Sequence, residues 1–256
     1  MQAGIEELLA WKGVAVGAWF LLLFAAERWR PAALPRLDEP GWRRLLRNAA
    51  LWAGNAVLSP LVVVPISAFA ASRAPSWRPE WWSGGFGLAL DLVLLDVLIY
   101  WWHRANHVVP LLWRFHSVHH LDRFLDTTSA VRFHAGEVVL SALARAGVIV
   151  VLAIPLASVL IFEALVLMAA MFHHSNLRLP PKLELALSLL VVTPSIHWVH
   201  HHRVRADTDS NYCTILSLWD RLFASRSPHA RTPDMTIGTE GREEERVLGL
   251  LAAPFR

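Results

Sequence analysis

Residues 85–120 read GFGLALDLVLLDVLIYWWHRANHVVPLLWRFHSVHH. The first half is an apolar run from Gly85 to Trp102 that only Asp91 and Asp96 interrupt, and its length is close to the roughly 20 residues that cross a bilayer. The second half carries five histidines in the patterns His-x3-His and His-x2-His-His. Because residues three and four apart share one face of a helix, this stretch predicts a membrane helix that continues out of the bilayer and presents imidazoles on one side.

Three further apolar stretches predict additional membrane helices. Gly13–Ala26 and Leu51–Ala71 are each consistent with one span, while Val138–Met171 covers 34 residues. The last stretch is too long for a single span, so we expect two helices hinged at Ile154-Pro155. The run Leu183–Val192 is too short to cross a bilayer and is expected at the surface.

The composition agrees with a membrane protein. Of 256 residues 55% are hydrophobic, thirteen are tryptophan, and the mean hydropathy is +0.38. Tryptophan favours the headgroup level of a bilayer. We therefore predict an all-α fold, a polytopic membrane helical bundle with a cytoplasmic histidine-rich metal site. We expect N-terminal anchor helices over residues 1–84, a histidine-box catalytic domain over 85–225 and a flexible C-terminal tail over 226–256.

The distribution of arginine predicts how the chain is oriented. Six arginines lie between the first and second apolar runs, and short loops rich in arginine face the cytoplasm: Arg28, Arg30, Arg36, Arg43, Arg44 and Arg47. Following the spans from there brings twelve of the thirteen histidines to the cytoplasmic side. We expect an integral protein of a bacterial inner membrane. The formal charge of +3 does not indicate nucleic-acid binding, because the basic residues cluster beside apolar runs.

Eight histidines in three clusters indicate a metal site, namely His103 and His107, then His116, His119 and His120, then His197, His200 and His201. Taken singly, each cluster could hold ordinary surface or core histidines. Together, neutral imidazoles have no shared reason to converge except a metal ion, because their charged forms repel one another. Imidazole suits zinc, copper, iron and nickel, and eight or nine nitrogen donors suffice for two metals with open positions. Two iron ions beside a membrane would suit dioxygen activation.

The order of the three clusters resembles the fatty acid hydroxylase and sterol desaturase superfamily, the membrane histidine-box di-iron oxygenases. Connecting segments between residues 86 and 225 share the resemblance: Trp102-His103-Arg104, Trp113-Arg114-Phe115-His116, Arg132-Phe133-His134-Ala135-Gly136-Glu137, His174-Ser175-Asn176 and Trp219-Asp220-Arg221-Leu222-Phe223. The resemblance implies an enzyme that hydroxylates or desaturates a lipid, such as a fatty acyl chain or a sterol-like molecule. It also implies two iron ions, which zinc can replace during purification, and O₂ as co-substrate.

By the same resemblance the eight clustered histidines become metal ligands. His174 becomes the ninth ligand, because it precedes the Ser-Asn of the family motif, and His173 is the less favoured alternative. His134 is expected to support a ligand from behind or to join the metal site. We expect no catalytic side chain beyond the ligands.

Two polar residues are candidates for supporting the ligands. Asp96 lies within the apolar run, where carboxylates are costly and usually paired or functional. It would either orient a ligand imidazole or pair with an arginine or a tryptophan N–H. Asn211 would brace the third cluster, together with nearby aspartates, unless these residues serve only in turns.

An oxygenase of this kind needs electrons from outside. The chain has no Gly-x-Gly-x-x-Gly motif, and Cys213 is its one cysteine. We therefore expect a separate cytochrome, ferredoxin or reductase as the electron donor. Two other interpretations stay open, a membrane metal-binding or transport protein and a non-catalytic relative that keeps the fold.

Overall fold

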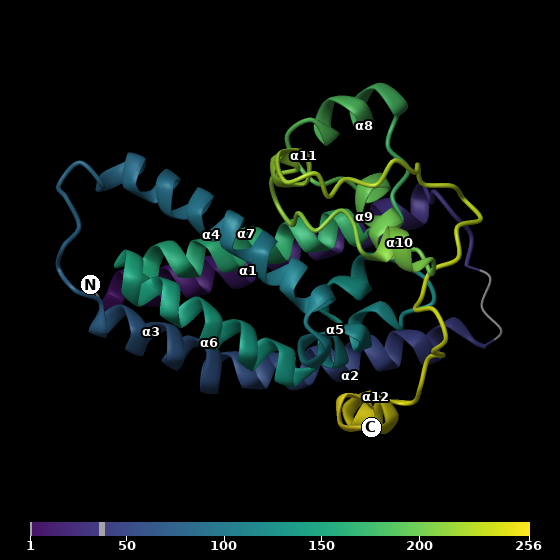
Figure 1. Cartoon of the computed structure of the whole chain (residues 1–256), viewed down its shortest axis with the longest axis horizontal. Coiled ribbons are helices and arrows are strands. Elements are labelled where there is room, and N and C mark those ends of the chain that lie inside the picture. The colour runs from purple at the N-terminus through teal and green to yellow at the C-terminus, as the bar shows by residue number, and fades with distance from the viewer. Residues whose placement is uncertain (1, 36–38) are drawn as a thin grey trace.

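The computed structural model describes residues 2–35 and 39–256, and the side chains of all of these except 2–6 and 8–10. Every regular element within the described ranges is a helix, and β pairing is confined to isolated bridges. In Figure 1 the long helices run together along the long axis of the molecule, and the short helices gather near one end. The predicted all-α class is confirmed.

The long helices form the bundle: α1 (Gln2–Trp29), α2 (Gly41–Leu58), a π-helical turn η1 (Ser59–Val63), α3 (Val64–Arg73), α4 (Gly84–Val108), α6 (Ala135–Leu152) and α7 (Leu156–His174). Four segments are long and apolar enough to cross a membrane: Gly41–Arg73, Gly84–Val108, Ala135–Leu152 and Leu156–His174. The run Gly13–Ala26 lies inside α1, and its span stays a prediction. The chain therefore has the helices of a polytopic membrane protein.

The short helices follow or connect the long ones: α5 (Pro110–His120), η2 (Thr127–Val131), α8 (Pro181–Ser188), α9 (Pro194–His200), α10 (Arg205–Thr208), α11 (Leu218–Leu222), α12 (Val247–Ala252) and η3 (Ala253–Phe255). The surface segment expected at Leu183–Val192 corresponds to α8, which has only eight residues. Helix α4 continues past its apolar run to Val108. The predicted extension of this helix into the histidine region is therefore confirmed.

The long apolar stretch divides where proline was expected to divide it. Helix α6 ends at Leu152, Ala153 adopts a left-handed conformation with φ 50°, and Pro155 precedes the first residue of α7. A proline lacks the N–H that would continue the helix and restricts the residue before it. The predicted hinge at Ile154-Pro155 is confirmed.

The core of the bundle lies between α3, α4, α6 and α7. Ala70, Leu95, Ile149, Val159 and Phe162 form one buried apolar cluster there. By contrast, tryptophan side chains remain exposed near both ends of α4, with Trp81 62% and Trp101 46% accessible. The 18 helical residues from Gly84 to Trp101 correspond to about 27 Å of helix, which is close to the roughly 30 Å of the hydrocarbon core of a bilayer. His103 lies two residues after Trp101 and is therefore expected near the membrane surface.

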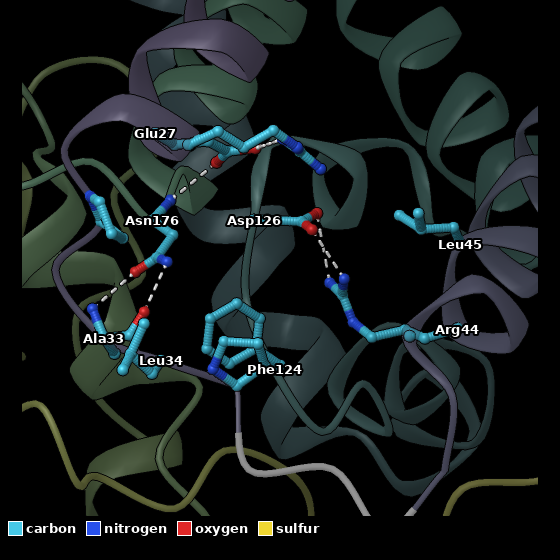
Figure 2. Close-up of a pocket in the computed structure, with 12 residues that line it drawn as sticks. Glu27, Ala33, Leu34, Arg44, Leu45, Phe124, Asp126 and Asn176 are labelled. Carbon is cyan, nitrogen blue, oxygen red and sulfur yellow. Dashed lines mark hydrogen bonds and ion pairs between the residues drawn. The ribbon is translucent and has the colours of Figure 1, made fainter.

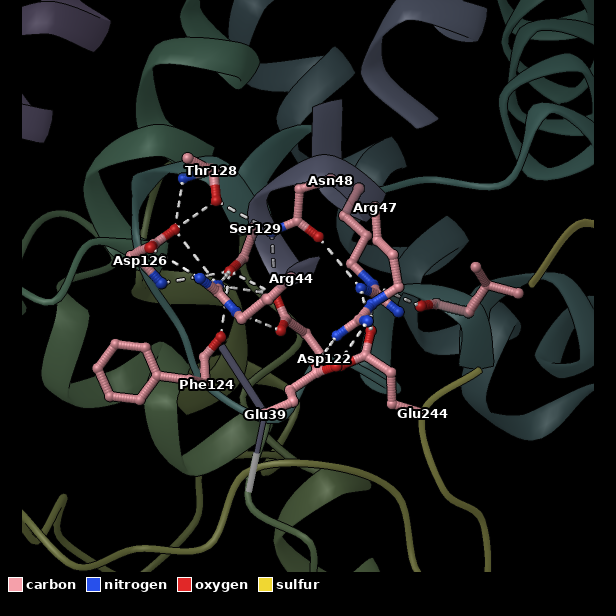
Figure 3. A network of polar contacts seen from close by, with 12 residues as sticks. Glu39, Arg44, Arg47, Asn48, Asp122, Phe124, Asp126, Thr128, Ser129 and Glu244 are labelled. Atoms are coloured by element: carbon pink, nitrogen blue, oxygen red, sulfur yellow. Dashed lines mark hydrogen bonds and ion pairs between the residues drawn. The ribbon is translucent and has the colours of Figure 1, made fainter. Parts of the chain in front are cut away.

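A buried ion-pair network joins α2 to the segment after α5 (Figure 3). Arg44 is 3% exposed and donates to both carboxylate oxygens of Asp122 at 2.6 and 2.9 Å and to Asp126 at 2.8 Å. The two carboxylates and Arg44 compensate one another. Burial alone would raise the pKa of Asp122, but the attraction of Arg44 outweighs it and lowers this pKa below its usual value. We call Arg44, Asp122 and Asp126 the Arg44 network.

The arginine-rich loop is thus only partly available to a lipid surface. Arg44 and Arg47 are buried and paired within the protein, Arg47 with Glu39 and Glu244. Arg36 lies outside the described residues. Two of the six arginines behind the orientation argument therefore have a structural role, and the cytoplasmic placement stays a prediction.

A pocket of about 310 Å³ lies beside this network (Figure 2). The buried carboxylate of Glu27 accepts hydrogen bonds there from the backbone N–H groups of Thr127 and Asn176, at 3.0 and 2.9 Å. The Asn176 side chain in turn binds the backbone of Ala33. These contacts tie the end of α1 to η2 and to the segment after α7.

The last thirty-one residues, 226–256, differ from the loosely held tail that we expected. The Glu244 carboxylate lies 2.6 Å from the guanidinium of Arg132, whose side chain is fully buried. Leu250 is also fully buried and packs against α2 and α5. A buried arginine without a carboxylate would be strongly destabilising. The tail supplies that carboxylate, a requirement that local composition did not reveal.

Replacing Arg44 should destabilise the fold severely. In Arg44→Ala two buried carboxylates lose their cation, which costs about 3–5 kcal/mol. Thermal unfolding in detergent measures the effect. The neighbouring Arg43 is exposed, so Arg43→Ala should change stability by less than about 0.5 kcal/mol. Equal losses in the two variants would contradict the role of the network.

Candidate metal centre

Nine histidines converge on two neighbouring sites. The first group contains His103, His107, His116, His120 and His200, and the second contains His119, His174, His197 and His201. Within each group one ring nitrogen of every member lies within 4.8 Å of the others. These are the nine histidines that we expected to act as ligands. The structure therefore brings all of them together, from four helices and the residue that follows α9.

Helical geometry explains how the clusters divide. In α5, His116 and His120 are four residues apart and share one face, whereas His119 points to the second group. At α9 the pattern is reversed, because His197 and His201 enter the second group and His200 enters the first. Each of these clusters therefore contributes to both sites, and α5 and α9 hold the two sites side by side.

Contacts at the Nδ1 atoms hold three imidazole rings of the first group in their orientation. His103 donates to the Tyr212 carbonyl at 2.8 Å, and His200 donates to the Ser210 carbonyl at 2.6 Å. The Asp209 carboxylate lies 3.4 Å from Nδ1 of His107. One short segment, residues 209–212, thus supports three imidazoles of the first group and leaves their Nε2 atoms facing inward.

The clearest sign of a cation-binding site is the contact between His119 and His174. Nδ1 of His119 donates to the Arg132 carbonyl at 3.0 Å, and Nδ1 of His174 donates to the Ala170 carbonyl at 2.8 Å. In a neutral imidazole the other nitrogen is then an acceptor. The two Nε2 atoms are nevertheless only 3.0 Å apart. Two lone pairs at this distance repel each other unless a positive ion lies between them.

Burial keeps these imidazoles in the neutral form that binds metals. The pKa values of His119, His120 and His201 are lowered well below the usual value by burial first and by neighbouring imidazoles second. Burial lowers the pKa of His200 to about 3. At neutral pH the rings therefore offer lone pairs rather than positive charges.

The donor set fits a pair of transition-metal ions. Metal–imidazole bonds of about 2.0–2.1 Å place neighbouring ligand nitrogens about 3 Å apart, close to the Nε2 separations of 3.0–3.2 Å in both groups. Five and four imidazoles leave room for further ligands on each ion. The chemistry of all-imidazole sites suits iron, zinc, copper or nickel.

One supporting carboxylate escaped the sequence analysis. Glu137, in the first turn of α6, accepts from Nδ1 of His116 at 2.7 Å and lies 3.4 Å from the Asn106 side-chain nitrogen. A carboxylate behind a ligand histidine fixes its tautomer and increases its basicity. Glu137 belongs to a motif already noted for its family resemblance, and its position at a helix start was the signal that could have identified it.

The three expected supporting residues lie near the site, and their hydrogen bonds go to neighbouring groups rather than to a ligand ring. Asp96 accepts from the Trp219 indole at 2.8 Å and from the Leu216 N–H, so it is the tryptophan partner considered as its alternative. Asn211 donates to the Ile196 carbonyl at 3.1 Å and braces the start of α9 through the backbone. His134 accepts from the Gly136 N–H and donates to the Leu251 carbonyl. Both of its ring nitrogens are occupied, which argues against a ligand role.

His173 is the remaining histidine next to the two groups. Its ring lies 3.9 Å from that of His197, measured between centroids, and neither of its nitrogens has a hydrogen-bond partner among the described residues. It does not belong to either group. The preference for His174 over His173 as the ninth candidate agrees with this geometry.

A cavity of about 270 Å³ opens onto the two groups. Its walls come mainly from η1, α4, α6 and α7, and they are largely apolar, with Ile99, Phe162, Val166 and Leu167 among them. Six imidazoles line it: His103, His116, His119, His173, His174 and His197. An apolar ligand in the bundle would therefore reach both groups.

Metal content provides a direct test of the two groups. We expect about two metal ions per chain after anaerobic purification with iron, and fewer in His201→Gln, because the second group loses one of its four imidazoles and holds its ion less tightly. Elemental analysis by mass spectrometry gives the ratio. The adjacent His202 pairs with Asp207 instead, so His202→Gln should retain both ions. Equal metal content in the two variants would contradict the assignment.

Removing the charge of Glu137 should weaken metal binding without unfolding the protein. We expect the iron affinity of Glu137→Gln to fall about 10–100-fold, as is typical when a carboxylate behind a ligand histidine is lost. Competition with a chelator measures this affinity. Glu80→Gln, in the exposed loop before α4, serves as the control. An unchanged affinity in Glu137→Gln would show that His116 needs no such support.

Comparison with known proteins agrees with this geometry. Residues 88–225, more than half of the chain, match the family model described as fatty acid hydroxylase. The ornithine lipid hydroxylase OlsE of Rhizobium tropici is 29% identical over 198 residues, which cover 77% of this chain and 58% of that protein. Alkylglycerol monooxygenase of Danio rerio is 30% identical over 149 residues, covering 58% of this chain and 32% of that protein.

Another relative is a very-long-chain aldehyde decarbonylase of Oryza sativa, 29% identical over 186 residues, which cover 68% of this chain and 28% of that protein. The chain thus spans less than two thirds of the length of each of these relatives. No solved structure matches. The family model covers all three histidine clusters, and the chain belongs to the fatty acid hydroxylase family.

Proposed function

We propose that this protein is a membrane-bound di-iron oxygenase that hydroxylates or desaturates a lipid with O₂ and external electrons. The chain is an integral membrane protein of a family whose members modify lipids oxidatively. The relatives named as hydroxylase and monooxygenase favour hydroxylation. The relative named as a decarbonylase indicates that related proteins also cleave carbon bonds.

The cavity of about 270 Å³ is the observation that carries this proposal. It joins an apolar space inside the membrane bundle to imidazoles of both groups. A metal transport protein would need ligands distributed along the bundle, whereas these ligands gather at one end of it. A lipid chain in the cavity would present a C–H bond to the metal site without leaving the bilayer.

Each part of the site has a definite task in this proposal. The nine histidines of the two groups would hold the two ions, which supply, when bound, the activation of O₂ for C–H oxidation. Glu137 and the carbonyls of Arg132, Ser210 and Tyr212 would hold the ligand rings in orientation. The walls formed by Phe162, Val166 and Leu167 would exclude water and align the chain, because orientation lowers the barrier.

Electrons would enter where the first group lies closest to solvent. The Trp113 ring contacts those of His107 and His120, with centroids 5.0 and 5.4 Å apart, and the Arg205 guanidinium lies 4.4 Å from the Trp113 centroid. Asp209, next to His107, is 37% exposed. We propose that a separate cytochrome, ferredoxin or reductase docks over this surface, on the cytoplasmic side of a bacterial inner membrane.

Lipid profiling tests the oxygenase proposal. Cells that express the intact chain should accumulate a lipid with one added oxygen atom, or with one added double bond, and labelled dioxygen should mark the hydroxylated product. His119→Ala with His200→Ala removes one ligand from each group and should abolish the product.

The matched control is His202→Ala with His229→Ala, which removes two imidazoles that bind Asp207 instead. This variant should keep the product. Identical lipid profiles for the intact chain and the ligand variant would contradict the proposed function.

A further inference from the structure

The end of the cavity away from the imidazoles carries charge. Glu163 on α7 lies 3.0 Å from the Lys12 ammonium of α1 and 2.9 Å from the Arg145 guanidinium of α6. The three side chains are between 14% and 21% exposed. We call Lys12, Arg145 and Glu163 the Arg145 cluster. Its two cations and one carboxylate give it a formal charge of +1.

The Arg145 cluster lies deep in the bundle. Arg145 follows Glu137, the support of His116, by eight residues on α6, and this spacing corresponds to about 12 Å along the helix. Ala135–Leu152 is one of the candidate membrane spans. An uncompensated charge inside a membrane is costly and usually serves a function. A structural ion pair between α6 and α7 would need only one cation.

Two members of the cluster face the cavity. Arg145 and Glu163 both line it, and Ser141 lines it between Arg145 and the imidazole end. The Nε atom of Arg145 is buried and has no hydrogen-bond partner among the described residues. Between this polar end and the imidazoles the wall is mainly apolar, with residues such as Val166 and Leu167. The cavity therefore has a cationic end, an apolar middle and a metal-binding end.

We propose that the Arg145 cluster binds the carboxylate of a single-chain fatty acid whose chain extends toward the histidine groups. The excess of one positive charge matches a monoanion, and the guanidinium fork matches a carboxylate. A volume of about 270 Å³ lies at the low end for ligand sites and suits one chain better than a two-chain lipid. A mid-chain carbon, rather than one beside the carboxylate, would reach the metal site. This inference names the substrate class of the proposed function and rests on it.

Binding of cis-parinaric acid and its methyl ester tests the site. Both are fluorescent in apolar surroundings, and only the acid carries a charge. Titrations use the full chain in lipid nanodiscs, with empty nanodiscs subtracted. We expect the acid to bind at least about tenfold more tightly than the ester, as for a hydrogen bond to a charged group.

Variants separate recognition from structure. Arg145→Met and Lys12→Met should each remove most of the preference for the acid, whereas Glu163→Gln, which adds positive charge, should increase it. Lys12→Met leaves the Arg145–Glu163 pair intact, so it keeps the test valid even if Arg145→Met does not fold. The control Arg78→Met breaks an ion pair with Asp91 whose residues do not line the cavity, and it should keep the preference.

Two results would overturn the proposal: equal binding of acid and ester by the intact chain, or a preference that survives in both Arg145→Met and Lys12→Met. The binding titration does not require the protein to oxidise the ligand, so the two proposals can fail separately. A chain that binds the acid through Arg145 but yields no oxidised lipid would contradict the oxygenase proposal alone. A chain that oxidises lipid without this preference would contradict the carboxylate site alone.

Discussion

The arrangement of the protein depends on one electrostatic constraint: many neutral imidazoles must present lone pairs to a common point. Such a site forms only if each ring is buried, stays uncharged and has its N–H satisfied elsewhere. Backbone carbonyls of Arg132, Ser210 and Tyr212 and the carboxylate of Glu137 supply these partners. The close approach of His119 to His174 is stable only when a cation compensates the repulsion.

This constraint explains why much of the polar structure lies outside the membrane helices. The Arg44 network holds the loop after α5, and Arg132 in that region both positions His119 and pairs with Glu244. The C-terminal segment is therefore part of the same support, although it lies far from the histidine clusters in sequence. The apolar surface of the bundle can then face lipid while the polar end keeps the imidazoles fixed.

The sequence pattern predicted those elements whose formation depends only on residues close together in the chain. The extension of α4 from Asp96 to His107 follows from helical periodicity, and the break at Pro155 follows from the missing N–H. The convergence of nine histidines was also expected. Two metal ions were expected as well, but the sequence did not predict which histidine joins which site, because that depends on how α5 and α9 face each other. Glu137 was missed, and Asp96 proved to serve Trp219, because a carboxylate has many possible partners and only the folded chain selects one.

By itself the sequence determined the helical class, the membrane character and the histidine set of this protein, because apolar run length and three- and four-residue spacing are properties of a continuous stretch of chain. Only the tertiary structure decided which carbonyls orient the rings, that residues 226–256 pack against the bundle, and that Lys12, Arg145 and Glu163 meet at one end of the cavity. Some of those contacts join residues more than a hundred positions apart, such as Lys12 with Glu163 and His103 with Tyr212. The energies of all of them depend on burial and mutual distance, which no local pattern specifies.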